Sequence, residues 1–286
     1  MKHIFLIGTG LIGGSMLLDM RSHFSEATFY GIDHNDAHAQ QAVKNGIIDQ
    51  VAQLEDLQKA DLVIVSIPVD ATLKVLPQIL DIIEENTLVI DVGSTKGAIC
   101  NTVEEHQNRR QFLAAHPIAG TEFSGPDAAM YDLFREKTMI VCEVEKTAFK
   151  LQERAKALFD LLGMRVRYMT PAAHDRHIAY VSHLSHISSF MLGKTVIQEE
   201  ENERDIFDLA GSGFESTVRL AKSSPAMWTP IFAQNKEHVL ASLDGYIENL
   251  SRFRESVNNN DYKAIYKEMA ATNRIKEILE GINDGK

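Results

Sequence analysis

A glycine-rich turn near the N-terminus places the strongest constraint on the fold of this chain. Residues 8–13 read Gly-Thr-Gly-Leu-Ile-Gly and follow directly after the apolar run HIFLI, which predicts a buried strand. In a GxGxxG pattern the glycines permit a tight turn, a close approach of the backbone to a ligand, and close packing of strand against helix. The pattern therefore predicts the first strand and helix of an α/β fold with a mostly parallel sheet.

An acidic residue completes the pattern of a dinucleotide-binding unit. The second predicted strand ends at Asp33, twenty residues after Gly13, where a carboxylate can accept hydrogen bonds from a ribose 2′-hydroxyl. No arginine follows in His34-Asn35-Asp36 to neutralise a 2′-phosphate. We therefore expect NAD rather than NADP, bound by Asp33 and by Gly8, Thr9, Gly10, Leu11, Ile12 and Gly13. A purely structural glycine turn in another α/β protein is the alternative.

The chain has two parts with different sequence patterns. Up to about residue 168, β-branched runs alternate with helix-like stretches, and strands are predicted at 3–8, 27–33, 61–68, 87–93, 111–117, 137–142 and 164–169. After Pro171, helical periodicity takes over at about 171–198, 203–222, 225–258 and 261–281. We expect a Rossmann-type dinucleotide-binding domain over 1–168 and an all-α substrate-binding and dimerisation domain over 169–286.

Composition excludes several classes of partner. The net charge of −11 argues against nucleic acid or an anionic membrane as the main partner, and no apolar run is long enough to span a bilayer. Two cysteines cannot form a disulfide framework and fit the cytoplasm. The N-terminal run is expected to be a strand and not a signal peptide. A small acidic substrate needs only a local cluster of cations.

Polar residues at the ends of the other predicted strands form a candidate site, because ligands bind outside the carboxyl ends of an open parallel sheet. They are Ser66 with Pro68, which we assign to the cofactor side, Ser94 with Lys96, and His116 with Pro117. His116 suits a proton acceptor in an oxidation, and its alternative is a histidine that merely bonds a loop. Lys96 is either a site cation or, as we favour, an exposed lysine in the first turn of a helix.

Several motifs together resemble the prephenate and arogenate dehydrogenase family. They are the glycine turn extended to Ser15, DVGSTK at 91–96, HPIAGTE at 116–122, SHLSH at 182–186, and the segment 213–228 with Val218-Arg219-Leu220-Ala221 and Ser224-Pro225-Ala226-Met227-Trp228. The match covers nearly the whole chain, and HPIAGTE with SHL-x-H is far more specific than the glycine turn. The resemblance implies an NAD-dependent oxidative decarboxylation of prephenate in tyrosine biosynthesis, or of its amino relative arogenate.

The resemblance also implies roles for individual residues. His116 would accept a hydrogen bond from the ring 4-hydroxyl and take its proton, and Ser94 would help to orient that hydroxyl and His116. Arg219 would bind a substrate carboxylate with its planar fork of donors. The rest of the substrate pocket would be lined by Thr121, Glu122, Ser182, His183 and His186.

The sequence departs from the family's usual motifs at three places. Ser185 stands where a proline is common, so we expect a less kinked turn and a different aim for His186. Glu215-Ser216 stands where a basic residue and an aspartate are frequent, and Thr229-Pro230 replaces an acidic stretch.

The helical half also allows other interpretations. Pairs of histidines three apart, His174 with His177 and His183 with His186, have the spacing of metal ligands, but no cysteine or carboxylate group completes a site, so no metal is expected. A β-hydroxyacid dehydrogenase would use a lysine of its helical domain, and a non-catalytic dinucleotide sensor would not need His116. The long apolar stripe that starts at Trp228 predicts a core or a subunit interface, and a homodimer.

Overall fold

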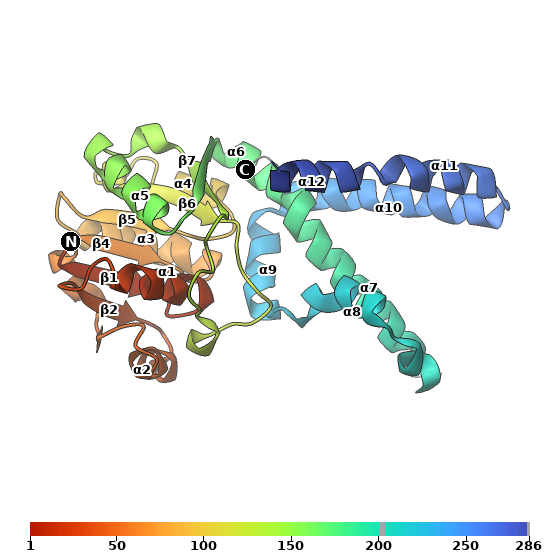
Figure 1. Cartoon of the computed structure of the whole chain (residues 1–286). Coiled ribbons are helices and arrows are strands. Elements are labelled where there is room, and N and C mark those ends of the chain that lie inside the picture. The colour runs from red at the N-terminus through yellow and green to blue at the C-terminus, as the bar shows by residue number, and fades with distance from the viewer. Residues whose placement is uncertain (201–203, 285–286) are drawn as a thin grey trace. The chain divides into compact units, whose positions relative to one another are not determined.

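Residues 1–200 and 204–284 are described by the computed structural model (Figure 1). They divide into a larger unit, Met1–His238, and a smaller unit that begins at Val239. The larger unit contains all the strands of the described residues and the helices up to α9. The candidate site lies in this larger unit.

Eight strands form one sheet in the order β3-β2-β1-β4-β5-β6-β7-β8. Their bounds are β1 His3–Ile7, β2 Thr28–Ile32, β3 Gln50–Val51, β4 Leu62–Val65, β5 Leu88–Asp91, β6 Phe112–Pro117, β7 Thr138–Cys142 and β8 Arg165–Met169. Neighbours pair in parallel except β6 with β7, which are antiparallel. All seven predicted strands are present. The exposed, two-residue β3 is an addition, because so short a strand leaves no apolar run in the sequence.

Helices cover both faces of the sheet (Figure 1). One face packs against α1 (Leu11–Arg21), α2 (Asp36–Lys44) and α5 (Phe149–Leu161), and the other against α3 (Val69–Ile82), α4 (Gly97–Thr102) and α9 (Pro225–Gln234). The central strands β1, β4 and β5 are therefore buried on both faces, as continuous apolar runs predict. The edge strand β8 instead exposes two arginines, which oppose pairing with another chain.

Beyond the sheet the chain is helical, as predicted. Thr170 caps α6 (Pro171–Ile178) by accepting a hydrogen bond from the Ala173 amide at 3.2 Å. A π-helical turn, Ala179–His183, joins α6 to α7 (Leu184–Glu200), so one continuous helical segment covers the predicted 171–198. The Ser185 hydroxyl donates to the Val181 carbonyl at 3.3 Å, and the helix continues through Ser185. The less kinked turn and the different aim of His186 stay predictions.

The prediction of one continuous helix over 203–222 is wrong. Residue 203 lies outside the described part, and the remainder consists of a 3₁₀ turn Arg204–Leu209, α8 (Ser212–Val218) and a second 3₁₀ turn Arg219–Lys222. Gly211 has extended backbone dihedrals immediately before α8. Glycine is a poor helix former, so the Gly-Ser-Gly sequence breaks what the periodicity had joined.

The predicted helix at 225–258 is two helices. The first, α9, starts at the predicted Ser224-Pro225 signal. Asn235 then leaves helical geometry with φ −106° and ψ 29°, and α10 (Lys236–Asn258) follows. Asn235 is 3% exposed, and its side-chain amide donates to the Asp175 carbonyl at 2.7 Å, which explains a polar residue in an apolar stripe.

The smaller unit consists of α10 from Val239 onward, α11 (Tyr262–Thr272) and α12 (Ile275–Asp284). Asp261 caps α11 as predicted and accepts from the Ala264 amide at 2.9 Å. Large apolar side chains remain exposed on these helices: Ile247, Leu250, Phe253, Val257, Tyr262, Tyr266, Met269, Ile275, Ile278 and Leu279. Among the described residues, no helix has the length and apolar character needed to cross a membrane.

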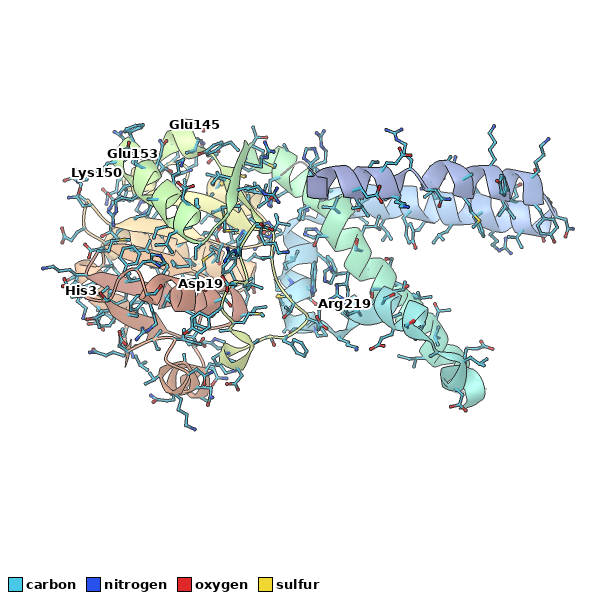
Figure 2. All side chains as sticks on the ribbon, viewed as in Figure 1. His3, Asp19, Glu145, Lys150, Glu153 and Arg219 are labelled. Atoms are coloured by element: carbon cyan, nitrogen blue, oxygen red, sulfur yellow. The ribbon has the colours of Figure 1, made fainter. Side chains whose placement is uncertain are left out.

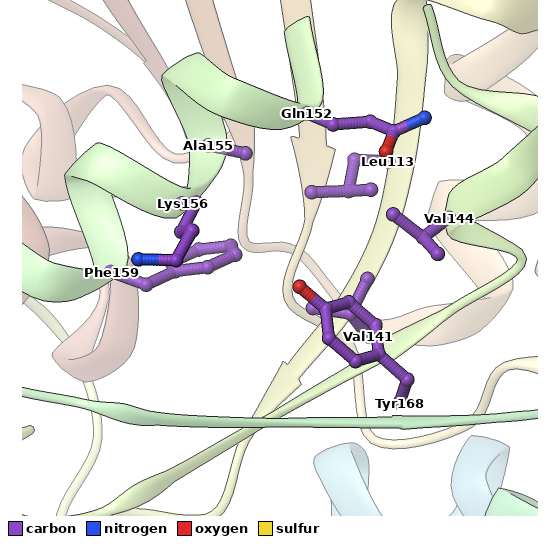
Figure 3. A pocket seen from close by; sticks show the side chains of 8 residues that line it. All are labelled: Leu113, Val141, Val144, Gln152, Ala155, Lys156, Phe159 and Tyr168. Atoms are coloured by element: carbon purple, nitrogen blue, oxygen red, sulfur yellow. The ribbon is translucent and has the colours of Figure 1, made fainter. Parts of the chain in front are cut away.

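A small hollow opens between α5 and the sheet of the larger unit (Figure 3). Leu113, Val141, Phe159 and Tyr168 are among the residues that line it. Its volume of about 20 Å³ suits a single water molecule. It is therefore far too small for a nucleotide or an aromatic acid.

Candidate active site

The glycine turn has the geometry that a dinucleotide requires. Gly8 adopts φ +90°, and a side chain there would meet the Ser66 carbonyl oxygen at 2.3 Å. A Cβ on Gly13 would meet Leu6 Cδ1 at 2.3 Å, whereas one on Gly10 would meet nothing within 4 Å. Gly8 and Gly13 are therefore needed for packing, and Gly10 keeps an open approach to the backbone.

The first turn of α1 presents free donors beside this open approach. Among the described residues, the Leu11 and Ile12 amides have no acceptor, because the first N–H groups of a helix have no partner within it. No acidic side chain occupies that turn. A pyrophosphate fits this combination of amides and positive dipole end.

Asp33 lies next to the glycine turn, as predicted. Its Oδ2 accepts from the Thr9 amide at 2.9 Å and the Thr9 hydroxyl at 2.8 Å, and its Oδ1 accepts from the Asn35 amide at 3.0 Å. Burial raises the pKa of Asp33, but these hydrogen bonds outweigh it and hold the pKa below its usual range. The ionised carboxylate keeps lone pairs for the hydroxyls of a ribose.

Ser66 and Pro68 support the turn from the neighbouring strand β4. The Ser66 hydroxyl accepts a hydrogen bond from the Gly13 amide at 3.1 Å, and Pro68 is the N-cap residue of α3. Ser66 therefore fixes the loop that would hold the pyrophosphate.

His116 stands at the carboxyl end of β6 and makes a short contact with a histidine of the helical half. Its Nδ1 lies 2.8 Å from Nε2 of His174, and Nδ1 of His174 lies 2.7 Å from Oδ1 of Asp175. His174 and Asp175 are 2% and 6% exposed. The three side chains thus form a buried chain of hydrogen bonds that ends at the candidate base.

Asp175 is fixed at both carboxylate oxygens. The Lys96 amide donates to its Oδ1 and the Gly97 amide to its Oδ2, each at 2.8 Å. These amides belong to the start of α4, so Asp175 also caps that helix. The His174 imidazole and these amides hold the pKa of Asp175 below its usual range, against the effect of burial.

Lys96 is buried, so our prediction of an exposed lysine was wrong. The side chain is 0% exposed, and its ammonium donates to the Asp91 carboxylate and, at 2.8 Å, to the Ala115 carbonyl. A carboxylate at the buried end of β5 needs a cation, and the side chain of Lys96 therefore turns inward.

The surroundings of His116 keep it neutral. Burial holds the pKa of His116 well below its ordinary value, and the neighbouring His174, Lys96 and His183 lower it further. Burial also lowers the pKa of His174, although the Asp175 carboxylate opposes this change. Both imidazoles are therefore uncharged at neutral pH, which is the form that a proton acceptor needs.

Arg219 lies on the carboxyl-end side of the sheet, opposite to His3 at the start of β1 (Figure 2). Its Nη1 donates to Oε2 of Glu122 at 3.1 Å, and half of its side chain is exposed. Among the described residues this is its only acceptor, so the other guanidinium donors are available. The Glu122 backbone amide and Arg219 lower the pKa of the Glu122 carboxyl.

His183, the last residue of the π-helical turn, and His186, in the first turn of α7, have different environments. The His186 ring stacks on Trp228 with centroids 3.6 Å apart, and its Nδ1 donates to the Ser182 carbonyl at 3.0 Å. His183 is 0% exposed, its Nδ1 accepts from the Asn235 side-chain amide at 3.2 Å, and burial lowers its pKa to about 4. His186 is thus partly open to the site, whereas His183 is enclosed behind it.

Two predicted residues have few contacts. Thr121 is exposed, and within the described part of the chain its hydroxyl accepts only from the Phe123 amide, at 3.3 Å. The Ser94 hydroxyl has no partner among the described residues, and the Nδ1 of His116 bonds to His174. The role of Ser94 in orienting His116 stays a prediction.

The sequence reasoning missed His174 and Asp175 as partners of His116. The spacing of His174 from His177 indicated only a possible metal ligand, and His177 is exposed. A signal was present in the segment 170–175, where a capped helix start places a histidine and an aspartate side by side just after the last strand.

This fold and its dinucleotide loop define a class, the dehydrogenases that use a nicotinamide dinucleotide. Two family models match consecutive parts of the chain: prephenate dehydrogenase, nucleotide-binding domain, at residues 17–168, and prephenate dehydrogenase, dimerization domain, at residues 170–271. The chain belongs to the prephenate dehydrogenase family, and the predictions of the family and of the fold class are confirmed.

Relatives of the chain carry names from this family. It is 32% identical to a prephenate dehydrogenase of Bacillus subtilis, over 92% of this chain and 72% of the relative. It is 26% identical to a cyclohexadienyl dehydrogenase of Zymomonas mobilis, over 99% of this chain and 98% of the relative.

Solved structures resemble it closely. That of prephenate dehydrogenase from Aquifex aeolicus in complex with hydroxyphenyl propionate and NAD+ has a TM-score of 0.86 and 31% identity, and the match covers 98% of each chain. That of Synechocystis arogenate dehydrogenase has a TM-score of 0.77 and 26% identity, over 97% of this chain and 99% of the other.

Proposed function

We propose that the chain is an NAD-dependent prephenate dehydrogenase, which converts prephenate to 4-hydroxyphenylpyruvate with loss of carbon dioxide in tyrosine biosynthesis. The observation that carries the proposal is the neutral His116 at the carboxyl end of β6, the same edge of the sheet as the glycine loop, in contact with His174 of the helical half. Family membership and the names of the relatives support the same activity.

His116 is the proposed catalytic base. Its imidazole accepts a hydrogen bond from the ring 4-hydroxyl and takes its proton as the adjacent carbon is oxidised. Bound NAD+ supplies the acceptor for the hydride that this carbon loses. As the ring carboxylate departs, its bonding electrons enter the ring, and the phenolate oxygen recovers the proton from His116. Aromatisation drives the reaction, so the main tasks of the protein are positioning and proton transfer.

Arg219 is the proposed anchor for a substrate carboxylate. A guanidinium binds a carboxylate through two parallel donors, and the single bond of Arg219 to Glu122 leaves enough donors for this. We assign Thr121, Glu122, Ser182, His183 and His186 to the walls of the substrate pocket, with His183 contributing through its packing against Trp228. We assign to Ser94 the orientation of the substrate's ring 4-hydroxyl.

The proposed cofactor is NAD. The amides of Leu11 and Ile12 would hold the pyrophosphate, and Asp33 would accept from the ribose hydroxyls. An ionised Asp33 repels a 2′-phosphate and so favours NAD over NADP.

The proposed assembly is a cytoplasmic homodimer. The apolar side chains exposed on α10, α11 and α12 would be buried against a second copy. The family model over residues 170–271, which include α10 and most of α11, describes a dimerization domain. Both cysteines are free and buried, which fits a reducing compartment. We place the domain boundary between residues 168 and 169, close to the end of β8.

The test is formation of NADH, followed by its absorbance, with purified protein, NAD+ and either prephenate or arogenate. We expect turnover with prephenate, and a H116N variant should lose about 10²–10⁴-fold in kcat. A H177N variant serves as a matched control, because His177 is an exposed histidine and should leave turnover unchanged.

Turnover with arogenate alone would replace the proposed substrate by its amino relative and leave the roles of the residues intact. Oxidation of neither substrate by protein that binds NAD+ would overturn the proposal, and β-hydroxy acids would then be tested.

A further inference from the structure

The hydrogen-bond chain behind His116 determines which nitrogen of each imidazole carries a proton. An ionised Asp175 only accepts hydrogen bonds, so Nδ1 of His174 must carry hydrogen. Neutral His174 then has a bare Nε2, which accepts from Nδ1–H of His116. His116 is left with hydrogen on Nδ1 and a bare Nε2.

The alternative, that these residues only support the fold, explains part of the arrangement. Asp175 caps α4 through two amides and needs no histidine for this. A buried imidazole that merely filled space would be replaceable by an apolar ring, without the cost of burying polar atoms. His174 instead uses both ring nitrogens in hydrogen bonds, one to Asp175 and the other to His116.

We propose that His174 and Asp175 are positioning residues that hold His116 with a bare Nε2 and store on His174 the proton taken from the substrate. This inference rests on the proposed function of His116 as the base. Its chemistry is a relay one imidazole longer than a catalytic triad, in which a carboxylate orients a single histidine.

The relay balances at each atom. The substrate O–H bond breaks as a bond forms to Nε2 of His116, and the Nδ1–H bond of His116 breaks as one forms to Nε2 of His174. His174 becomes an imidazolium beside the Asp175 carboxylate, which stabilises its charge. The proton returns along the same path when the phenolate forms.

The location of the positive charge follows from the neighbours. His116 faces His174, His183 and the Lys96 ammonium, all of which disfavour a charge on it. His174 also faces Lys96, but the carboxylates of Asp175 and Asp91 oppose that cation. The first proton that the pair takes up therefore resides on His174, and His116 Nε2 is then blocked by the shifted hydrogen.

The first test uses the unliganded protein and needs no substrate. Nuclear magnetic resonance of protein with isotope-labelled histidine identifies the protonated nitrogen of each imidazole. We expect hydrogen on Nδ1 in both His116 and His174, and an ε-protonated His116 would overturn the proposal. Because this measurement requires no turnover, it remains decisive if the proposed substrate is wrong.

The second test uses two variants of His174 and the control H177Q. H174F removes the acceptor, so His116 should revert to the ε tautomer and kcat should fall about 10–100-fold, with KM little changed. H174Q retains an acceptor oxygen, so His116 should keep hydrogen on Nδ1 and much of the loss in kcat should be recovered. H177Q should behave like the wild type.

The pH profile separates proton storage from structural support. In the wild type, the acidic limb of kcat/KM follows the pair, whose first proton resides on His174. In both His174 variants it follows His116 alone and should move to lower pH. A limb at the wild-type pH in folded H174Q would overturn proton storage, because a purely structural role leaves that limb unchanged.

Discussion

Loss of the buried ion pair between Lys96 and Asp91 is expected to destabilise the fold. A K96M variant keeps most of the side-chain volume but removes the ammonium and leaves Asp91 with one hydrogen bond, from the Gly93 amide. The Ala115 carbonyl also loses its bond to the side chain. Removing one partner of a buried pair costs about 3–5 kcal/mol, because the remaining charge has no compensation.

The magnitude can be read from thermal unfolding followed by circular dichroism. At roughly 2–4 °C for each kcal/mol in a unit of this size, a loss of about 4 kcal/mol lowers Tm by roughly 8–16 °C. A K150M variant is the matched control: Lys150 is an exposed lysine on α5 (Figure 2), and its loss should change stability by less than about 0.5 kcal/mol.

The stability loss of K96M depends on pH because the substitution changes the pKa of Asp91. Burial raises the pKa of Asp91 even beside the Lys96 ammonium, and loss of that ammonium raises it further. The penalty of the substitution is therefore absent below about pH 4 and grows as the pH rises. The deficit of K96M should therefore shrink in acid, and D91N/K96M should recover most of the lost stability. A deficit below about 1 kcal/mol, or a double variant no more stable than K96M, would refute the reasoning.

The cofactor loop gives two further predictions. G10A should keep the wild-type Tm but weaken NAD+ binding in a titration, whereas G13A should lower Tm, because only the second Cβ meets other atoms within the fold; equal melting temperatures for the two variants would contradict this. D33N should raise the KM for NAD+ by about 10–100-fold, since it removes a charged acceptor worth about 1.5–3 kcal/mol. The same variant should reduce the enzyme's preference for NAD+ over NADP+. D36N is its exposed control, and a D33N enzyme with unaltered KM for both cofactors would show that Asp33 does not contact the ribose.

The sequence predicted those parts of the fold that depend on local pattern. Six of the seven longer strands carry a buried run, and the exposed edge strand β8 is the exception. The glycine turn and Asp33 are tied to strand ends, so their meeting follows from a parallel sheet alone. The helix breaks at Gly211 and Asn235 were missed because apolar periodicity continues across them. At Asn235 the break depends on hydrogen bonds to Asp175 and His183, which are distant in sequence.

The candidate site was predicted in part for the same reason. His116 was found because a parallel sheet collects strand ends at one edge. Its bond to His174 spans 58 residues and joins β6 to α6, and no local pattern encodes such a contact. Lys96 was misjudged because its burial depends on the Asp91 carboxylate, and a lysine in the first turn of a helix is ordinarily exposed.

The bond between His116 and His174 crosses the proposed boundary at residue 168. In the proposed mechanism, one half of the chain would supply the atom that meets the substrate, and the other half would determine how that atom is protonated. A fragment ending at the boundary could retain the nucleotide loop and still lack a usable base. Recombining halves from related dehydrogenases therefore carries a requirement besides a matching interface: the incoming helical half must provide an acceptor at the position of His174.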